Sequence, residues 1–373
     1  MSKENTTTFL DYFDDIEDPR SDKGKLYSAH EILLVTICGL ICGAESWRDF
    51  VVFGNEKLEF FMDYLPFENG IPSKNTFCRF FASLKPEQFK KCFVEWVNNL
   101  SLLKNEVIAI DGKRLCNSFN MLNKKSAIHM VSAFAAKTKL VLAQQKVDDK
   151  SNEITAIPKL LDLLDIKDNI VTIDAMGTQK EIATKIIENG GNYILALKGN
   201  NSILHEDVID FFTDNMNNPQ KNFKIAKDVD CGHGRIEERN CFVTDKIDWL
   251  GELKFPGQKS IICINSSRTI GDITSTEKRY YISSLVANAE KINMATRDHW
   301  AVENCLHWSL DVTFNEDNSR IRNDNAAENI AMIRHTALNL LQISKSKYKG
   351  TSIKGLRKKA GWGNSTLKAI LEQ

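Results

Sequence analysis

The chain has 373 residues, of which 42% are hydrophobic and 26% are charged, and its formal net charge at pH 7 is zero. This composition is typical of a folded globular protein and argues against a low-complexity or disordered chain. Nine cysteines without a CxxC pair argue against a structural zinc site and a disulfide framework. The acidic amino terminus is unlike a signal peptide, and the most apolar run (32–44) is shorter than the roughly 20 residues that cross a bilayer. We therefore expect a cytoplasmic protein with no membrane partner.

The first hundred residues have the periodicity of short amphipathic helices, and we expect a helical N-terminal domain over 1–104. The predicted helices cover residues 28–40, 47–64, 74–84 and 86–100. Two interpretations of 73–84 remain open. It is the second helix of a helix-turn-helix that presents Lys74, Asn75 and Arg79 to DNA, or it is packing scaffold.

From residue 105 the pattern changes to short apolar strands that alternate with helices. The predicted strands are 107–111, 127–136, 139–147, 170–174 and 193–197, with helices at 154–164 and 180–189. The second and third strands form a hairpin. The order predicts an α/β fold, a mixed sheet flanked by helices, whose first part spans 105–200. Residues 201–293 are strand-like after a short helix and are predicted to form a β-rich insertion, after which 294–343 return to helix and complete the core.

Two of the predicted strands end in an aspartate that is followed by a residue with almost no side chain. These segments are VIAID-G, which ends in Asp111, and IVTID-A, which ends in Asp174. Side chains at the carboxyl ends of adjacent strands in α/β sheets converge on a crevice where ligands bind. A single aspartate after a strand more often shapes a turn or caps a helix. We expect Thr178 and Glu181 to cap the helix after Asp174 as a capping box, which leaves Asp174 available for chemistry.

The predicted helix over 294–312 has an unusual polar face. Every fourth position from His299 is titratable, and aromatic or amide side chains flank this column. Its members are His299, Glu303, His307 and Asp311, flanked by Trp300, Asn304 and Trp308. A helix of a globular protein buries an apolar stripe, so this face is typical of the wall of a site. The HExxH pattern of zinc peptidases is excluded, because the two histidines of the column lie eight residues apart.

Three carboxylates suit the hard cation Mg²⁺, which prefers oxygen ligands and substrate phosphates. Two such ions promote in-line displacement at phosphorus. They also relieve the repulsion among the three carboxylates, which amounts to roughly several kcal/mol when no metal is bound. We therefore predict Asp111, Asp174 and Glu303 as catalytic, metal-binding residues that hold two Mg²⁺ or Mn²⁺ ions.

Basic residues are concentrated behind these acids. Arg320, Arg322 and Arg334 are candidates for contacts to DNA phosphates. The predicted C-terminal tail over 344–373 contains eight basic residues and no acid between Ser344 and Ala369. Phosphate binding and a solvated, mobile end are the two interpretations of this segment. Its basic residues are Lys345, Lys347, Lys349, Lys354, Arg357, Lys358, Lys359 and Lys368.

Several long segments resemble one known family. They are IAIDGK, TIDAMGTQKEIATKIIENGGNYILALKGN, RDHWAVENCLHWSLDVTFNEDNSRIRNDNAAENIAMIRHTALNLL, IPSKNTFCRFFASLKPEQF and GHGRIEER. They resemble the DDE transposases of bacterial insertion sequences, in the group that includes the H-repeat-associated proteins of Rhs elements. The resemblance implies an RNase H-like core with Asp111, Asp174 and Glu303 as the metal triad. It also implies binding of element ends, cleavage, joining of the 3′-hydroxyl to target double-stranded DNA, and a dimer on DNA.

The chain departs from this family around Glu303. Related transposases often have the spacing Y-x2-R-x3-E-x6-K, and the three flanking positions hold Thr296, His299 and Leu310 here. Other residues must then grip the DNA end. We name Lys198, His299, Asn304 and His307 as candidates.

Three alternatives remain open at this stage. One is a nuclease of the same fold that cuts DNA without joining it. Another is a transposase-derived regulator that binds DNA through its N-terminal helices, against which the intact acid triad argues. The last is a catalytically silent copy inside an Rhs locus.

Overall fold

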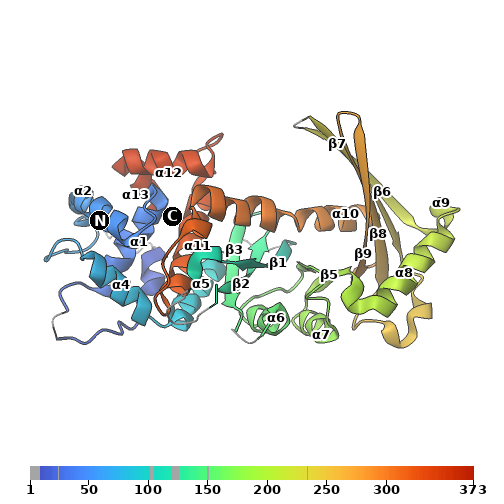
Figure 1. Cartoon of the computed structure of the whole chain (residues 1–373), viewed down its shortest axis with the longest axis horizontal. Coiled ribbons are helices and arrows are strands. Elements are labelled where there is room, and N and C mark those ends of the chain that lie inside the picture. The colour runs from blue at the N-terminus through green and yellow to red at the C-terminus, as the bar shows by residue number, and fades with distance from the viewer. Residues whose placement is uncertain (1–8, 24, 101–104, 120–125, 149–150, 233) are drawn as a thin grey trace, which may run out of the picture.

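The computed structural model describes residues 9–23, 25–100, 105–119, 126–148, 151–232 and 234–373. The molecule is elongated, with helices at one end, the first strands of a sheet in the middle and a group of long strands at the other end (Figure 1). The first described residues and the C terminus both lie in the helical part. No single helix in the described ranges is long and apolar enough to cross a bilayer, although α1 (Ala29–Cys42) and α2 (Trp47–Glu56) pass that test as a pair bent by 95°.

The N-terminal helices begin where the sequence places good capping residues. Ser28 and Glu31 form a capping box on α1, Ser46 and Asp49 form one on α2, and Pro86 occupies the first turn of α5. The predicted helix over 47–64 is divided into α2 and α3, so a single element was the wrong expectation there. The helices are α1 (Ala29–Cys42), α2 (Trp47–Glu56), α3 (Leu58–Phe61), α4 (Lys74–Ser83) and α5 (Pro86–Asn99), preceded by the 3₁₀ turn η1 (Phe9–Phe13).

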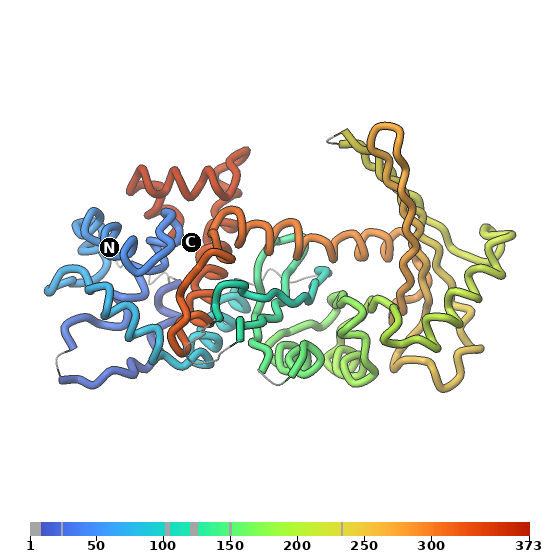
Figure 2. Tube along the Cα trace, viewed as in Figure 1, coloured from blue at the N-terminus to red at the C-terminus, as the bar shows by residue number. Residues whose placement is uncertain are grey.

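The end of the chain returns to these helices, as the red and blue segments of Figure 2 show. α1 packs against α11 (Ala326–Ser344), α12 (Ile353–Trp362) and α13 (Asn364–Leu371), and α11 also contacts α4, α5 and β3. The segment predicted as a basic tail therefore forms two packed helices. Arg357 lies inside this body, where its Nη2 donates to the carbonyl oxygen of Leu40 at 2.7 Å and its guanidinium covers the Phe314 ring.

The described residues form one mixed sheet of nine strands in the order β3-β2-β1-β4-β5-β9-β8-β7-β6. β1, β4 and β5 are parallel to one another, and β2 and β3 form the predicted antiparallel hairpin beside β1. This confirms the predicted order of strands and helices in the first part of the core. The strands are β1 (Val107–Arg114), β2 (His129–Ala135), β3 (Leu140–Lys146), β4 (Ile170–Ile173) and β5 (Asn192–Leu197).

The β-rich segment continues this same sheet. β9 pairs with β5 in antiparallel fashion, which closes an edge of the core that would otherwise offer unpaired backbone groups. The distal ends of β7, β8 and β9 project beyond the rest of the molecule (Figure 1). The segment contains α8 (Ser202–Asn215), α9 (Pro219–Asn222), β6 (Lys224–Gly232), β7 (Arg235–Thr244), β8 (Ser260–Ile270) and β9 (Ile273–Ser283).

Helices cover both faces of the sheet (Figure 1). On one side α6 (Glu153–Leu161) packs on β2 and β3, and α7 (Lys180–Glu188) packs on β5. On the other side α10 (Ala289–Asp298) crosses β1, β4 and β5. The chain then continues in two π-helical turns, Val302–His307 and Ser309–Thr313, where the sequence predicted one α-helix over 294–312. π-helical turns are rare in proteins, and a large share of those that occur lie at functional sites.

Candidate active site

The two strand-end aspartates occupy equivalent positions on adjacent strands. β1 and β4 are parallel, and their register aligns Ile110 with Ile173, the residues directly before Asp111 and Asp174. The parallel pairing therefore brings both acids to the same edge of the sheet, as the sequence predicted from the carboxyl ends of the strands.

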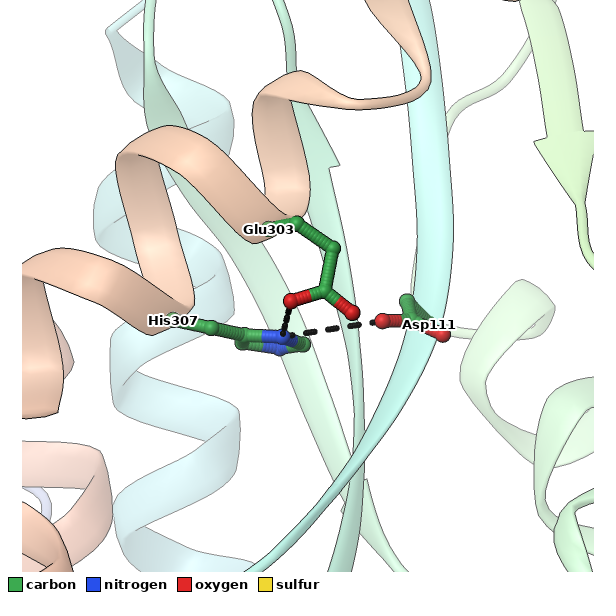
Figure 3. Close-up of side chains that lie close together, drawn as sticks. All are labelled: Asp111, Glu303 and His307. Atoms are coloured by element: carbon green, nitrogen blue, oxygen red, sulfur yellow. Dashed lines mark hydrogen bonds and ion pairs between the residues drawn. The ribbon is translucent and has the colours of Figure 1, made fainter. Parts of the chain in front are cut away.

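The first π-helical turn places Glu303 and His307 over Asp111. One ligand atom from each of these residues lies within 4.8 Å of the other two. The Nδ1 atom of His307 is 3.4 Å from Glu303 Oε2 and 3.6 Å from Asp111 Oδ2, and it points between the two carboxylates (Figure 3). Two acids separated by 192 positions in the chain (111 and 303) thus meet at one imidazole.

The electrostatics of this cluster oppose the charged form of Asp111. Burial raises the pKa of Asp111 to about 8, and the charges of Glu303, Glu153 and Asp174 act in the same direction. Burial lowers the pKa of His307, with Lys113 adding to this effect and Glu303 opposing it. A neutral imidazole beside crowded carboxylates leaves the negative charge uncompensated by protein groups. A divalent cation would supply the missing charge.

The expected capping box after Asp174 is absent, and that prediction is wrong. The N-cap of α7 is Gln179, and the Thr178 hydroxyl donates instead to the carbonyl oxygen of Ala196 at 2.6 Å. Asp174 Oδ1 accepts a hydrogen bond from the backbone N–H of Gly177 at 3.3 Å. Asp174 therefore shapes the turn after β4, and it is not among the three residues whose ligand atoms meet within 4.8 Å, although its charge raises the pKa of Asp111. The argument that Asp174 has no structural role no longer supports its selection.

A fourth acid lies beside the cluster and was missed by the sequence analysis. Glu153, in the first turn of α6, receives a 2.8 Å contact from His129 Nε2 on β2. A Cβ atom on Gly112 would stand 2.1 Å from Glu153 Oε1, so a larger residue after Asp111 would force the Glu153 side chain to move. The small residue after each strand-end aspartate was a visible signal of such close packing, but it did not indicate which side chain fills the space.

Lys113 links β1 to the segment that follows the π-helical turns. Its Nζ contacts Asp311, and it lies 3.5 Å from Glu316 Oε2. Glu316 in turn pairs with Arg334 at 3.5 Å, and both side chains are buried. Asp311 therefore neutralises Lys113 and does not join the acid cluster. The burial of Arg334, which is only 2% exposed, argues against its predicted contact with DNA phosphates.

The other residues predicted to touch DNA fall into three groups. His299 and Arg322 are engaged within the protein: His299 Nδ1 is 2.9 Å from the Thr172 hydroxyl, and Arg322 Nε donates to the carbonyl oxygen of Asn117. His307, by contrast, is buried at the acid cluster. The exposed residues are Lys74, Asn75, Arg79, Lys198, Asn304 and Arg320.

The positions that depart from the Y-x2-R-x3-E-x6-K spacing face the interior. Thr296 is buried and accepts a hydrogen bond from Arg239 Nη2, while Leu310 is buried in the core. Neither side chain can reach a DNA strand, so any contact near Glu303 must come from exposed neighbours such as Asn304.

The residues of the cluster fit a divalent cation. Carboxylate oxygens are the ligands that Mg²⁺ and Mn²⁺ prefer, and two ligands on opposite sides of an ion at about 2.1 Å lie about 4.2 Å apart. The ligand atoms of Asp111 and Glu303 already lie within 4.8 Å of each other, and small side-chain rotations suffice to reach the shorter separation.

Comparison with known proteins places these residues within recognised families. Residues 10–97 match the family described as DDE_Tnp_1-associated, and residues 103–340 match the family described as Transposase DDE domain. Over 342 residues, which cover 89% of each chain, the protein is 43% identical to "H repeat-associated putative transposase YhhI" of Escherichia coli K12. Over 370 residues it is 40% identical to "Putative transposase YncI" of Escherichia coli O157:H7, covering 98% of this chain and 94% of the relative. A short relative, "Inactive transposase YbfQ" of Escherichia coli K12, is 46% identical over 54 residues, 14% of this chain and 64% of its own length.

Proposed function

The chain belongs to the DDE transposase family, and we propose that it is an active, metal-dependent polynucleotidyl transferase. It binds the ends of its insertion sequence, hydrolyses a DNA strand there, and joins the freed 3′-hydroxyl to target DNA. The observation that carries the proposal is the meeting of Asp111, Glu303 and His307 at the edge of the sheet, beside Asp174. A protein that only binds DNA has no need for such a cluster.

We assign Asp111, Asp174 and Glu303 to the divalent ions, with Mg²⁺ or Mn²⁺ as the cofactor. When bound, two ions supply activation of the attacking oxygen and stabilisation of the leaving oxygen in an in-line displacement. The protein holds the three acids in fixed relative positions. Asp111 and Asp174 stand on paired strands, and Lys113 ties β1 to Asp311 behind the Glu303 turn. This fixes the distance between the acids on the strands and the acid on the helix.

We further propose that the core is RNase H-like. The order β3-β2-β1-β4-β5, with an antiparallel hairpin beside three parallel strands and helices on both faces, supports this assignment. In this interpretation β6 to β9 are an insertion whose last strand extends the core sheet.

DNA recognition is assigned to two exposed basic surfaces. One is the first turns of α4, where Lys74, Asn75 and Arg79 face solvent, and we propose that it reads the element end. The other, which we call the C-terminal lysine surface, lies on α12 and α13 and the loop before them and grips phosphates. Its exposed members are Lys347, Lys349, Lys354, Lys358, Lys359 and Lys368. Two element ends must be held together during transposition, so we also propose a dimer on DNA.

The test of the function is strand cleavage by charge-neutralised variants. We expect Asp111→Asn, Asp174→Asn and Glu303→Gln each to abolish Mn²⁺-dependent cleavage of DNA that carries the terminal repeats, with binding of that DNA nearly unchanged. Glu290→Gln, on the exposed side of the first turn of α10, is the matched control and should cleave like the native protein. Cleavage that persists in chelator, or a correctly folded variant that loses binding and cleavage together, would contradict the proposal.

The recognition assignment needs point variants, because the N-terminal helices pack against α11, α12 and α13 and a truncation would expose the core. Replacing Lys74, Asn75 and Arg79 together with alanine should remove the preference for element ends over random duplex in mobility-shift titrations. If the triple variant keeps the full preference for element ends, these three residues do not read the end sequence and another surface of the protein does.

A further inference from the structure

A small cavity adjoins His307, and neither Asp111 nor Glu303 is among the residues that line it. It measures about 10 Å³, which is close to the space that one water molecule occupies. Its polar lining consists of Ser132 and Gln144 on the sheet, His335 on α11, the ion pair of Lys113 and Glu316, and His307. The cavity therefore separates the imidazole at the acid cluster from a second imidazole in the core.

Its walls carry polar atoms that the protein leaves without hydrogen bonds. Within the described part of the chain, Gln144 Oε1 and Nε2, His307 Nε2 and His335 Nδ1 are buried and have no hydrogen-bond partner. The three side chains are 1%, 7% and 4% exposed, respectively. Buried polar groups in native proteins are almost always paired, with ordered water where protein atoms do not suffice. The cavity thus has both the volume and the polar partners that a water requires.

The sheet connects this cavity to the acid cluster. The register places Ser132 opposite Asp111 and Gln144 opposite Ser132, so the three side chains form one row on a single face across β1, β2 and β3. His307 contacts Asp111 and Glu303 through Nδ1 (Figure 3), and it also lines the cavity, while its Nε2 is buried without a hydrogen-bond partner among the described residues. Each ring nitrogen therefore has its own distinct environment.

We propose that His307 is a nitrogen ligand of the divalent-ion site through Nδ1, and that water in the cavity holds the Nε2 proton and so fixes the ligating tautomer. The inference rests on the proposed function and extends its all-carboxylate ligand set. A neutral imidazole has one protonated nitrogen and one lone pair. Metal-binding histidines donate the other N–H to a fixed acceptor, which orients the ring. A cavity lined by Gln144 and His335 provides this acceptor through its water.

A ligand set that contains both carboxylate oxygens and an imidazole nitrogen changes which divalent ion the site binds most tightly. Oxygen-only sites suit Mg²⁺, whereas imidazole favours Mn²⁺, Co²⁺ and other transition ions over it. Because His307 stands between Asp111 and Glu303, the ion they share is the one affected. We expect full-length protein to bind Mn²⁺ more tightly than Mg²⁺ by at least about ten-fold, and His307→Gln to lose most of this preference.

The direct test is the electron spin echo of Mn²⁺ bound to the full-length protein, in which a coordinated imidazole produces ¹⁴N modulation. The native protein should show this modulation and His307→Gln should not. His205→Gln is the matched control, because His205 packs on Tyr280 away from the cluster, and it should keep the modulation. Bound Mn²⁺ without ¹⁴N modulation in the native protein, or modulation that survives in His307→Gln, would overturn the inference while leaving the carboxylate site intact. No Mn²⁺ binding at all would instead refute the proposed function on which it rests.

A second pair of variants tests the role of the cavity. Gln144→Met removes two unpaired polar atoms at similar volume, and we expect it to weaken Mn²⁺ binding about ten-fold in calorimetric titrations. Thr336→Val is the control, because Thr336 is a buried polar residue next to His335 whose hydroxyl bonds only within α11. If a folded Gln144→Met protein binds Mn²⁺ with unchanged affinity, the cavity does not influence the metal site. This result would contradict the proposal that water in the cavity fixes the ligating tautomer of His307.

Discussion

Asp111→Asn should make the metal-free protein more stable at neutral pH. The pKa of Asp111 is raised from 3.8 to about 8, so between these values the folded protein binds more protons than the unfolded chain. Stability contributed by this group therefore falls as the pH rises from about 4 to about 8. Each pKa unit corresponds to about 1.36 kcal/mol, which gives an upper limit of about 4 kcal/mol at pH 7. The Asp111 side chain keeps 17% of its surface exposed to solvent, which screens its charge, and part of its pKa shift comes from the charge of Glu303. We therefore expect a smaller gain in stability of about 2 kcal/mol.

The assay is urea unfolding in excess chelator at several pH values. The gain of Asp111→Asn over the native protein should be near zero at pH 4 and should grow toward pH 8. Asp272→Asn, at the exposed turn between β8 and β9, should show no such gain and is the control. Mn²⁺ should reverse the order of stability, because only the native protein retains the full ligand set. A gain that does not depend on pH, or a loss of stability at pH 7 in chelator, would refute this account of the cluster.

Three further changes test the surroundings of the site. Arg334→Met should destabilise the fold by about 3 kcal/mol in the same unfolding assay, because it removes one of the two cations that pair with the buried Glu316 and leaves only Lys113 beside it, whereas Arg320→Met at an exposed position should be near neutral. Gly112→Ala should displace Glu153 and weaken Mn²⁺ binding in calorimetric titrations, and an unchanged affinity would show that the close packing has no effect on the ions. Neutralising four lysines of the C-terminal lysine surface should reduce the slope of log affinity against log salt by about 3 to 4 without changing sequence preference, and an identical slope would exclude phosphate contacts there. The four substitutions are Lys347→Gln, Lys354→Gln, Lys358→Gln and Lys359→Gln.

Local patterns in the sequence predicted the parts of the fold that depend on local forces. The alternation of strands and helices over 105–200 is confirmed, and β4 ends directly before Asp174, but β1 continues past Asp111 to Arg114, so the predicted strand end at Asp111 is wrong. The polar face around Glu303 was visible from spacing alone, because i and i+4 positions share one side of a helix. The two π-helical turns were not predicted, since hydrophobic periodicity does not distinguish them from an α-helix.

The features that the sequence concealed depend on contacts between distant segments. The many lysines near the end of the sequence predict a tail, whereas in the structure the buried Leu356 and Leu367 lie on helices that pack against α1, more than 300 positions away. The position of Arg334 close behind the acids in the sequence predicts a DNA contact, and nothing in the sequence identifies Glu316 as its buried partner. His307 is likewise predicted to contact DNA, and only the register of β1 and the course of the π-helical turn bring it to Asp111.

Strand joining tests the central claim most directly. Full-length protein, DNA fragments with pre-cut terminal repeats and a supercoiled target plasmid are incubated with Mn²⁺, and joined products are resolved by electrophoresis. We expect joined products from the native protein and from Glu290→Gln, and at most about a thousandth as much from Glu303→Gln, because removing a whole ligand from a metal-dependent phosphoryl transfer should cost about 4 kcal/mol or more of transition-state stabilisation. Joining by Glu303→Gln at the native rate, or cleavage without joining by the native protein, would contradict the assignment of this chain as a transposase that works through Asp111, Asp174 and Glu303.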